Sequence, residues 1–306
     1  MNIRFRVAAT AMLSCAVLLS HAALAEPVQP YVLAYTAAGT VGSESANVRT
    51  KLAAGGFEVL GEYSPYAGAL VIGVTNAAMK AAVAKDPLGG FGAIEHVSLT
   101  AAGNQVQVSY LNPTYLAAAY RLSGDYADLA AALKSALGAE KFFGTEKGRE
   151  PADLRKFNYM VGMEHFENYY KLASHASYAE AVKAVDDNLS KKVGGAALVY
   201  KLEIPGKEQT VFGVSRASVG DERANDKHIM YEVVDQSFPV KTTAYLPYQV
   251  MVNGKDTLAL HMRFRMAVWH PDLTMMTFGK LMSSPGAIED LLAKVAGRDE
   301  KKFAGF

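Results

Sequence analysis

The residue types best suited to chemistry lie in an apolar segment near the end of the chain, residues 257–269 (TLALHMRFRMAVW). Its length and composition predict a long β-strand, in which alternate side chains point to opposite faces of a sheet. His261, Arg263 and Arg265 would then lie in a row on one face. His270 follows directly after the segment. Because a guanidinium group binds carboxylate or phosphate through paired hydrogen bonds, this row predicts a site for an anion.

The same row of side chains has two structural explanations. An antiparallel sheet commonly leaves one face in water, where charged side chains need no ligand. Arginines on such a face can also pair with carboxylates of a neighbouring lobe. Both explanations stay open beside the anion site.

Methionines crowd the same region: Met262, Met266, Met275, Met276 and Met282. Thioether and imidazole ligands suit copper. Alternation along the predicted strand and the helical spacing of the later methionines instead favour core packing, since methionine commonly fills gaps in a core. No H-E-x-x-H motif and no pair of histidines four residues apart on a predicted helix indicates zinc. The sequence therefore predicts no metal ligand and no cofactor.

Two motifs of known enzyme classes are missing from the sequence. Residues 37–43 (AAGTVGS) lack the spacing of a phosphate-binding loop, and no G-x-S-x-G elbow is present. Glu164 and His165 are neighbours on a predicted helix, where they point about a hundred degrees apart and cannot readily share a substrate. No catalytic residue is assigned. A hydrolase or isomerase that uses His261 or His270 as its base stays an alternative.

The chain has 16 tyrosines, more than a core requires. Tyrosine combines apolar area with a hydroxyl group and is typical of ligand clefts and protein interfaces. A tyrosine-rich protein-interaction module is therefore a third interpretation. The tyrosines that favour it include Tyr115, Tyr120, Tyr169, Tyr170, Tyr245 and Tyr248.

The elements that position these residues form two series. Short β-rich segments predict strands, and patterned segments with caps predict helices. In the first half we expect strands at residues 31–35, 57–63, 69–74, 94–99 and 105–111, with helices at 43–54, 76–84 and 125–137. In the second half we expect a helical stretch over 151–192, broken near 173–177, and strands at 197–204, 210–215, 229–234, 248–252 and 257–269.

Residues 105–138 and 257–297 share one predicted order of elements: strand, X-Pro junction, short helix, capped second helix and closing glycine. The junction is Asn112-Pro113 in the first copy and His270-Pro271 in the second. This order predicts an internally duplicated α+β fold of two related lobes, each an antiparallel or mixed sheet covered by helices. We expect the first lobe to span residues 26–145 and the second, diverged lobe residues 146–306.

Residues 106–122 (VQVSYLNPTYLAAAYRL) resemble the closing element of the bacterial family catalogued as domain of unknown function three hundred and two. The segment GGFEVLGEY, residues 55–63, and the apolar strand before Thr75-Asn76 extend the resemblance over residues 31–138. The resemblance implies an α+β lobe with helices packed on a sheet. It brings no established activity and no catalytic residue. The second half would be a diverged copy.

Residues 1–25 are typical of a secretory signal peptide, with two arginines, an apolar segment and Ala23-Leu24-Ala25 before the expected cleavage after Ala25. The mature protein is therefore expected in the periplasm or secreted. The single cysteine, Cys15, lies inside this segment, so the mature chain could form no disulfide. Lipidation of Cys15 is the alternative. No later segment has the length of a membrane span.

Two of the 31 lysines and arginines lie in the signal peptide, and the 30 acidic residues all follow it, which leaves a mature net charge near minus one. Such a charge excludes the basic surface typical of nucleic-acid binding. We therefore predict an exported, non-enzymatic protein that binds a small anionic ligand or an envelope partner between its lobes. The residues assigned to the ligand are His261, Arg263, Arg265, His270 and Tyr245.

Overall fold

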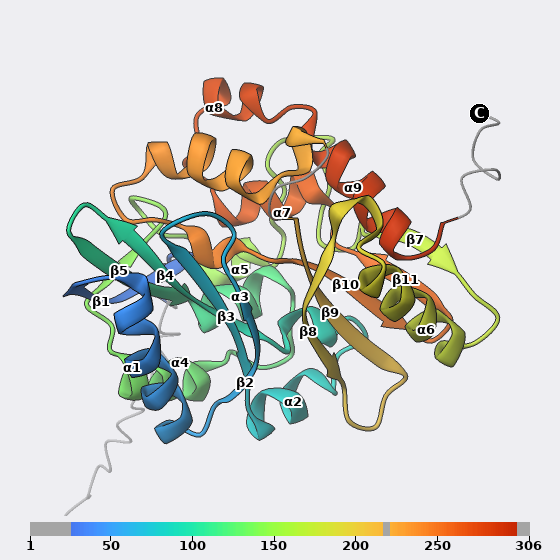
Figure 1. Ribbon diagram of the computed structural model, residues 1–306, viewed down its shortest axis with the longest axis horizontal. Helices are drawn as coiled ribbons and strands as arrows, with labels where there is room; N and C mark the ends of the chain where they lie inside the picture. Colours follow the sequence, from blue (N-terminus) through green and yellow to red (C-terminus); the bar gives the residue numbers. More distant parts are fainter. Residues whose placement is uncertain (1–25, 217–220, 299–306) are drawn as a thin grey trace, which may run out of the picture.

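A computed structural model describes residues 26–216 and 221–298 (Figure 1). The predicted signal peptide and its cleavage site lie outside the described residues. The described chain combines two antiparallel sheets with helices, so the predicted α+β class with two lobes is confirmed.

The first sheet has six strands in the order β2-β3-β4-β5-β1-β6. These strands are β1 (Tyr31–Ala38), β2 (Glu58–Tyr63), β3 (Ala69–Thr75), β4 (Glu95–Ala102), β5 (Gln105–Leu111) and β6 (Lys141–Phe143). The second sheet has five strands in the order β7-β11-β10-β9-β8. These strands are β7 (Tyr170–Ser174), β8 (Ala197–Glu203), β9 (Gln209–Ser215), β10 (Tyr248–Asn253) and β11 (Asp256–Ala259).

The α-helices are α1 (Val41–Ala54), α2 (Ala77–Val83), α3 (Pro113–Ala119), α4 (Ala127–Leu137), α5 (Pro151–Leu154), α6 (Tyr178–Ser190), α7 (Met262–Trp269), α8 (Met275–Lys280) and α9 (Ser284–Val295). Shorter turns are η1 (Gly89–Gly92), η2 (Val193–Gly195), η3 (Glu222–Ala224), the π-helix η4 (Lys227–Val234), η5 (Asp235–Ser237) and η6 (Thr243–Tyr245). Helices α1 and α4 pack on the first sheet, and α6 and α9 pack on the second (Figure 1).

The two sheets repeat one topology. Strands β1 to β5 and strands β7 to β11 follow each other along the chain and take the same places in their sheets, with the first strand beside the fifth. The last hairpin of each sheet also matches. Ala102 pairs with Gln105 and Asn253 with Asp256, and each two-residue loop begins with a glycine of positive φ, as a tight hairpin requires. The topology supports an internal duplication.

Three predicted elements of the second half are wrong. Residues 155–169 are not helical, and β7 follows them as the edge strand that pairs with β11. Residues 229–234 belong to the π-helix η4 instead of a strand. The strand predicted at 257–269 ends at Ala259, after which α7 begins. A short apolar segment fits a buried strand and a buried helix equally well. The segments that it packs against decide which of the two forms.

A short turn of each lobe packs against the sheet of the other lobe. Turn η1 of the first half packs against β9 and β10, and the corresponding turn η6 of the second half packs against β4 and β5. Edge strands β2 and β8 lie next to each other at the centre of the molecule (Figure 1). A Cβ on Gly61 would lie 1.9 Å from the carbonyl oxygen of Val199, so only glycine allows the two backbones to approach this closely.

Tyrosine hydroxyls bridge the two halves. Tyr66 donates to Asp235 over 3.0 Å, and Tyr115 donates to the carbonyl of Val268 over 2.5 Å. From the second half, Tyr200 lies 2.7 Å from Nε2 of His96. Buried hydroxyls of this kind satisfy polar groups that would otherwise be unpaired in an apolar interface. These three tyrosines therefore lie between the lobes.

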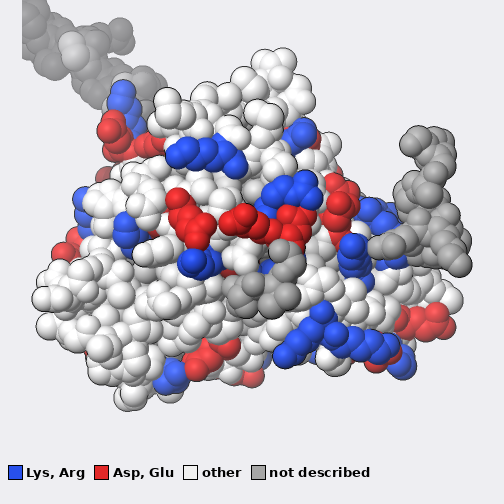
Figure 2. Space-filling model, turned by 45° about the horizontal axis from the view of Figure 1, so that its top comes forward, with Lys and Arg blue, Asp and Glu red and all other residues white. Residues whose placement is uncertain are grey.

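The surface agrees with the composition. Figure 2 shows acidic and basic side chains interspersed on one face, without a broad area of either charge. None of the helices in the described ranges is both long enough and apolar enough to cross a membrane.

Candidate functional site

Helix α7 begins within the segment that the sequence predicts as a strand. His261 is its N-cap, and its Nδ1 accepts a hydrogen bond from the backbone N–H of Arg263 over 3.3 Å. Residues two apart on an α-helix point about 200° apart, whereas on a strand they share a face. Arg263 and Arg265 therefore point in different directions, and the predicted row does not form.

The cap also changes which residues correspond in the two repeated segments. Asn112 caps α3 by accepting from the backbone N–H of Thr114 over 3.2 Å, as His261 does at α7. The counterpart of Asn112 is therefore His261. His270 instead ends α7 as its C-cap residue.

Arg265 is locked inside the molecule and is 4 % exposed. Its Nη2 donates to the carbonyl of Tyr245 and, over 2.9 Å, to that of Pro247. The guanidinium lies 4.0 Å from the centre of the Tyr245 ring, a cation–π contact. Its Nε and Nη1 make no hydrogen bond to the described chain, and neither do the hydroxyls of Tyr245 and Tyr248.

His270 packs beside this arginine. Its ring centre lies 4.8 Å from that of Tyr245, and its Nε2 lies 3.3 Å from the hydroxyl of Tyr31 in the first half. Burial is the main cause that lowers the pKa of His270 to about 3; the hydrogen bond to the carbonyl of Met266 opposes the shift and the charge of Arg265 adds to it, so the imidazole is neutral at physiological pH. The structure thus brings Arg265, Tyr245 and His270 together in the interior.

His261 and Arg263 lie apart from that group, beside Glu164. Nε2 of His261 is 3.3 Å from Oε1 of Glu164, and Nη1 of Arg263 is 3.4 Å from the same oxygen. Because Nδ1 of His261 accepts a backbone N–H, its proton must sit on Nε2, where it is donated to Glu164. Burial lowers the pKa of His261, and Glu164 opposes this. Both ring nitrogens are occupied, which argues against a free catalytic base.

A pocket of about 560 Å³ does lie between the two halves of the chain. It is bordered by the β6 region and by residues 237–240, with Lys141, Glu146 and Asp272 among its charged lining. None of the residues assigned to the anion lines it.

A second, more apolar pocket opens on the surface of the second half. Its volume is about 300 Å³, and Arg263 is the one charged residue in its lining. The other lining residues are Tyr159, Met160, Met163, Met266, Ala267, Met275, Phe278, Gly279, Leu281, Met282 and Pro285. We call this the methionine pocket.

The methionine pocket contradicts part of the prediction that the methionines of this region pack in the core. Met262 and Met266 are buried as predicted, but Met275 and Met282 are 64 % and 79 % exposed. The lining residues between Tyr159 and Met163 come from a segment that the sequence predicts as helical and that is irregular. In the sequence, the signal for this pocket is the number of methionines in the region. Core packing explains that number just as well.

Comparisons with protein-family models, with curated proteins and with solved structures find no match to this chain. The family resemblance drawn from residues 31–138 stays a prediction.

Proposed function

We propose that this chain is an exported, non-enzymatic binding protein whose ligand is a small amphiphile with an anionic head group, held in the methionine pocket. The observation that carries the proposal is an open apolar pocket with a single cation in its lining. Export rests on the predicted signal peptide. The proposal narrows the predicted anion binding to one of the two arginines.

The apolar part of the ligand would lie among methionines. Met160, Met275 and Met282 are between 52 % and 79 % exposed, which is unusual for large apolar side chains and typical of binding surfaces. Methionine is unbranched and polarizable, so it adapts to ligands of different shape. The pocket volume of about 300 Å³ lies at the lower end for small-molecule sites.

The head group would bind Arg263. Its side chain is 57 % exposed, and only Nη1 is engaged, by Glu164. Its other N–H groups make no hydrogen bond to the described chain, so they are available to a carboxylate. Glu164 is itself held by His261, which fixes the position of the arginine at the rim.

The experiment compares two ligands that differ in the head group, decanoate and decanol, by calorimetric titration of the mature protein. Gly279 lines the pocket, and a Cβ there would meet no atom within 4 Å, so Gly279→Leu places an apolar side chain in the pocket. Gly286→Leu is the matched control, since Gly286 also has open space at its Cβ but does not line the pocket.

We expect wild type and G286L to bind decanoate alike, and G279L to bind it at least about tenfold more weakly, a change of ~1.4 kcal/mol. Arg263→Gln should weaken the binding of decanoate and leave the binding of decanol unchanged. The proposal fails if G279L binds decanoate as wild type does, or if R263Q weakens both ligands equally.

A further inference from the structure

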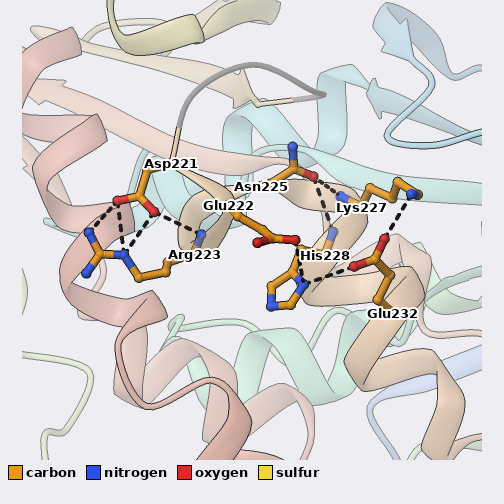
Figure 3. Close-up of polar contacts among 7 residues, drawn as sticks. All are labelled: Asp221, Glu222, Arg223, Asn225, Lys227, His228 and Glu232. Carbon is orange, nitrogen blue, oxygen red and sulfur yellow. Dashed lines mark hydrogen bonds and ion pairs between the residues drawn. The ribbon is translucent and has the colours of Figure 1, made fainter.

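A histidine and two glutamates converge on the surface of the second half (Figure 3). Glu222 belongs to η3, and His228 and Glu232 belong to η4. Nδ1 of His228 lies 3.0 Å from Oε2 of Glu232 and 3.8 Å from Oε1 of Glu222. We call these three residues the His–Glu cluster. None of them lines the methionine pocket, so a ligand of the cluster would bind independently of the proposed function.

Two capped turns hold the cluster in place. The side chain of Asp221 accepts from the backbone N–H of Arg223 over 3.0 Å at the start of η3. The side chain of Asn225 accepts from the backbone N–H groups of Lys227 and His228, over 2.9 and 3.2 Å, at the start of η4 (Figure 3). These caps fix the backbone on both sides of the cluster.

The separations in the cluster suit a tetrahedral metal ion. Zinc binds imidazole nitrogen and carboxylate oxygen at about 2.0–2.2 Å, which places neighbouring ligand atoms of a tetrahedral site about 3.4 Å apart. The two separations from Nδ1, 3.0 and 3.8 Å, lie on either side of this value. All three ligand atoms lie within 4.8 Å of one another, so small side-chain rotations would complete the geometry.

The charges of the cluster also suit a cation. Lys227 pairs with Oε1 of Glu232 over 2.8 Å and leaves Oε2 for a metal. Glu222 forms no ion pair with a lysine or arginine of the described residues. Since carboxylates only accept hydrogen bonds, Nδ1 of His228 carries a proton that a metal ion would replace.

We propose that Glu222, His228 and Glu232 bind one divalent transition-metal ion, with zinc as the probe ion and the fourth position open to water. One imidazole with two carboxylates is a ligand set that such ions accept, whereas Mg²⁺ prefers oxygen ligands alone.

The test is calorimetric titration of ZnCl₂ into the mature protein, produced without a polyhistidine tag and freed of metal with a chelator. We expect one zinc ion per chain, undisturbed by millimolar Mg²⁺. His228→Asn should lower the zinc affinity by about tenfold or more, and E222Q and E232Q should lower it too. His165→Asn is the matched control, because His165 lies outside the cluster.

Melting of each variant without zinc separates loss of binding from loss of folding. We expect H228N to melt as wild type does without zinc and to lose the zinc-dependent rise in melting temperature. No zinc uptake by the wild-type protein would overturn the proposal. So would equal zinc affinity of H228N and wild type.

Discussion

Arg263 and Arg265 are two residues apart and have opposite surroundings. Arg263 is 57 % exposed beside one carboxylate, whereas Arg265 is 4 % exposed between the carbonyls of Tyr245 and Pro247. Removing a buried, hydrogen-bonded side chain leaves a cavity and unpaired acceptors, whereas an exposed ion pair contributes little.

We therefore expect Arg265→Ala to lower the free energy of unfolding by about 3 kcal/mol, and Arg263→Ala to change it by less than about 0.5 kcal/mol. Urea denaturation of the two variants measures both values. The exposed arginine is the control for loss of a positive charge in the same helix. Equal effects of the two variants would contradict the packing of Arg265.

His270 makes stability depend on pH. The pKa is about 3 in the folded protein against 6.5 for a free imidazole. The unfolded chain therefore binds a proton that the folded protein does not between about pH 6.5 and 3, and the folded state loses stability as the pH falls through this range.

His270→Gln removes that proton. The difference in unfolding free energy between wild type and H270Q should shrink by about 1.4 kcal/mol for each pH unit from pH 6 to pH 4. Denaturant titrations at half-unit steps of pH measure it. From pH 7.5 to 8.5 the difference should stay constant, which is the internal control. A difference that is also constant below pH 6 would rule out a neutral, buried His270.

At the scale of elements, local sequence predicts some segments well. Strand β5 occupies the predicted residues 105–111, because alternating apolar side chains end at the Asn-Pro junction. Helix α7 gives no such signal, since its residues are buried on nearly every side and show no polar period. Without a polar period, the sequence gives no sign of which side chains of α7 are buried, so Arg265 resembles a surface residue.

The repeated junction gives a prediction at this scale. His261 caps α7 as Asn112 caps α3, so asparagine should replace the histidine without loss. We expect His261→Asn to keep the melting temperature of wild type and His261→Ala to cost about 1 kcal/mol, the usual value of a lost N-cap. Thermal melting of both variants checks this. If H261N were as unstable as H261A, the cap would not be what His261 contributes.

At the scale of the whole molecule, the two lobes share one core. Tyr200 of β8 packs on glycines of both sheets, and a Cβ on Gly73 or on Gly213 would lie 2.6 Å from its ring. Trp269, the single tryptophan of the chain, packs against Tyr115 and Tyr120 of the first half. An interface this closely packed should make the lobes unfold together.

We expect urea unfolding followed by Trp269 fluorescence and by far-ultraviolet circular dichroism to give one coincident transition, because the first signal reports the interface and the second reports both sheets. Gly73→Ala should lower both midpoints together, because overpacking lowers the free energy of unfolding by about 1–3 kcal/mol. Gly103→Ala would add backbone strain in a loop, so the matched control is Gly286→Ala, whose Cβ meets open space. Two separate transitions would show independent lobes.

The sequence by itself determined strands β1 to β5 of the first half, its main helices and the α+β class, because caps, turns and alternation act over a few neighbouring residues. The tertiary structure alone decided that Arg265 lies between Tyr245 and Pro247, that Arg263 borders the methionine pocket, and that Glu222 meets His228. These outcomes depend on which segments pack together. A short apolar segment fits a strand or a helix, and only its partners select one.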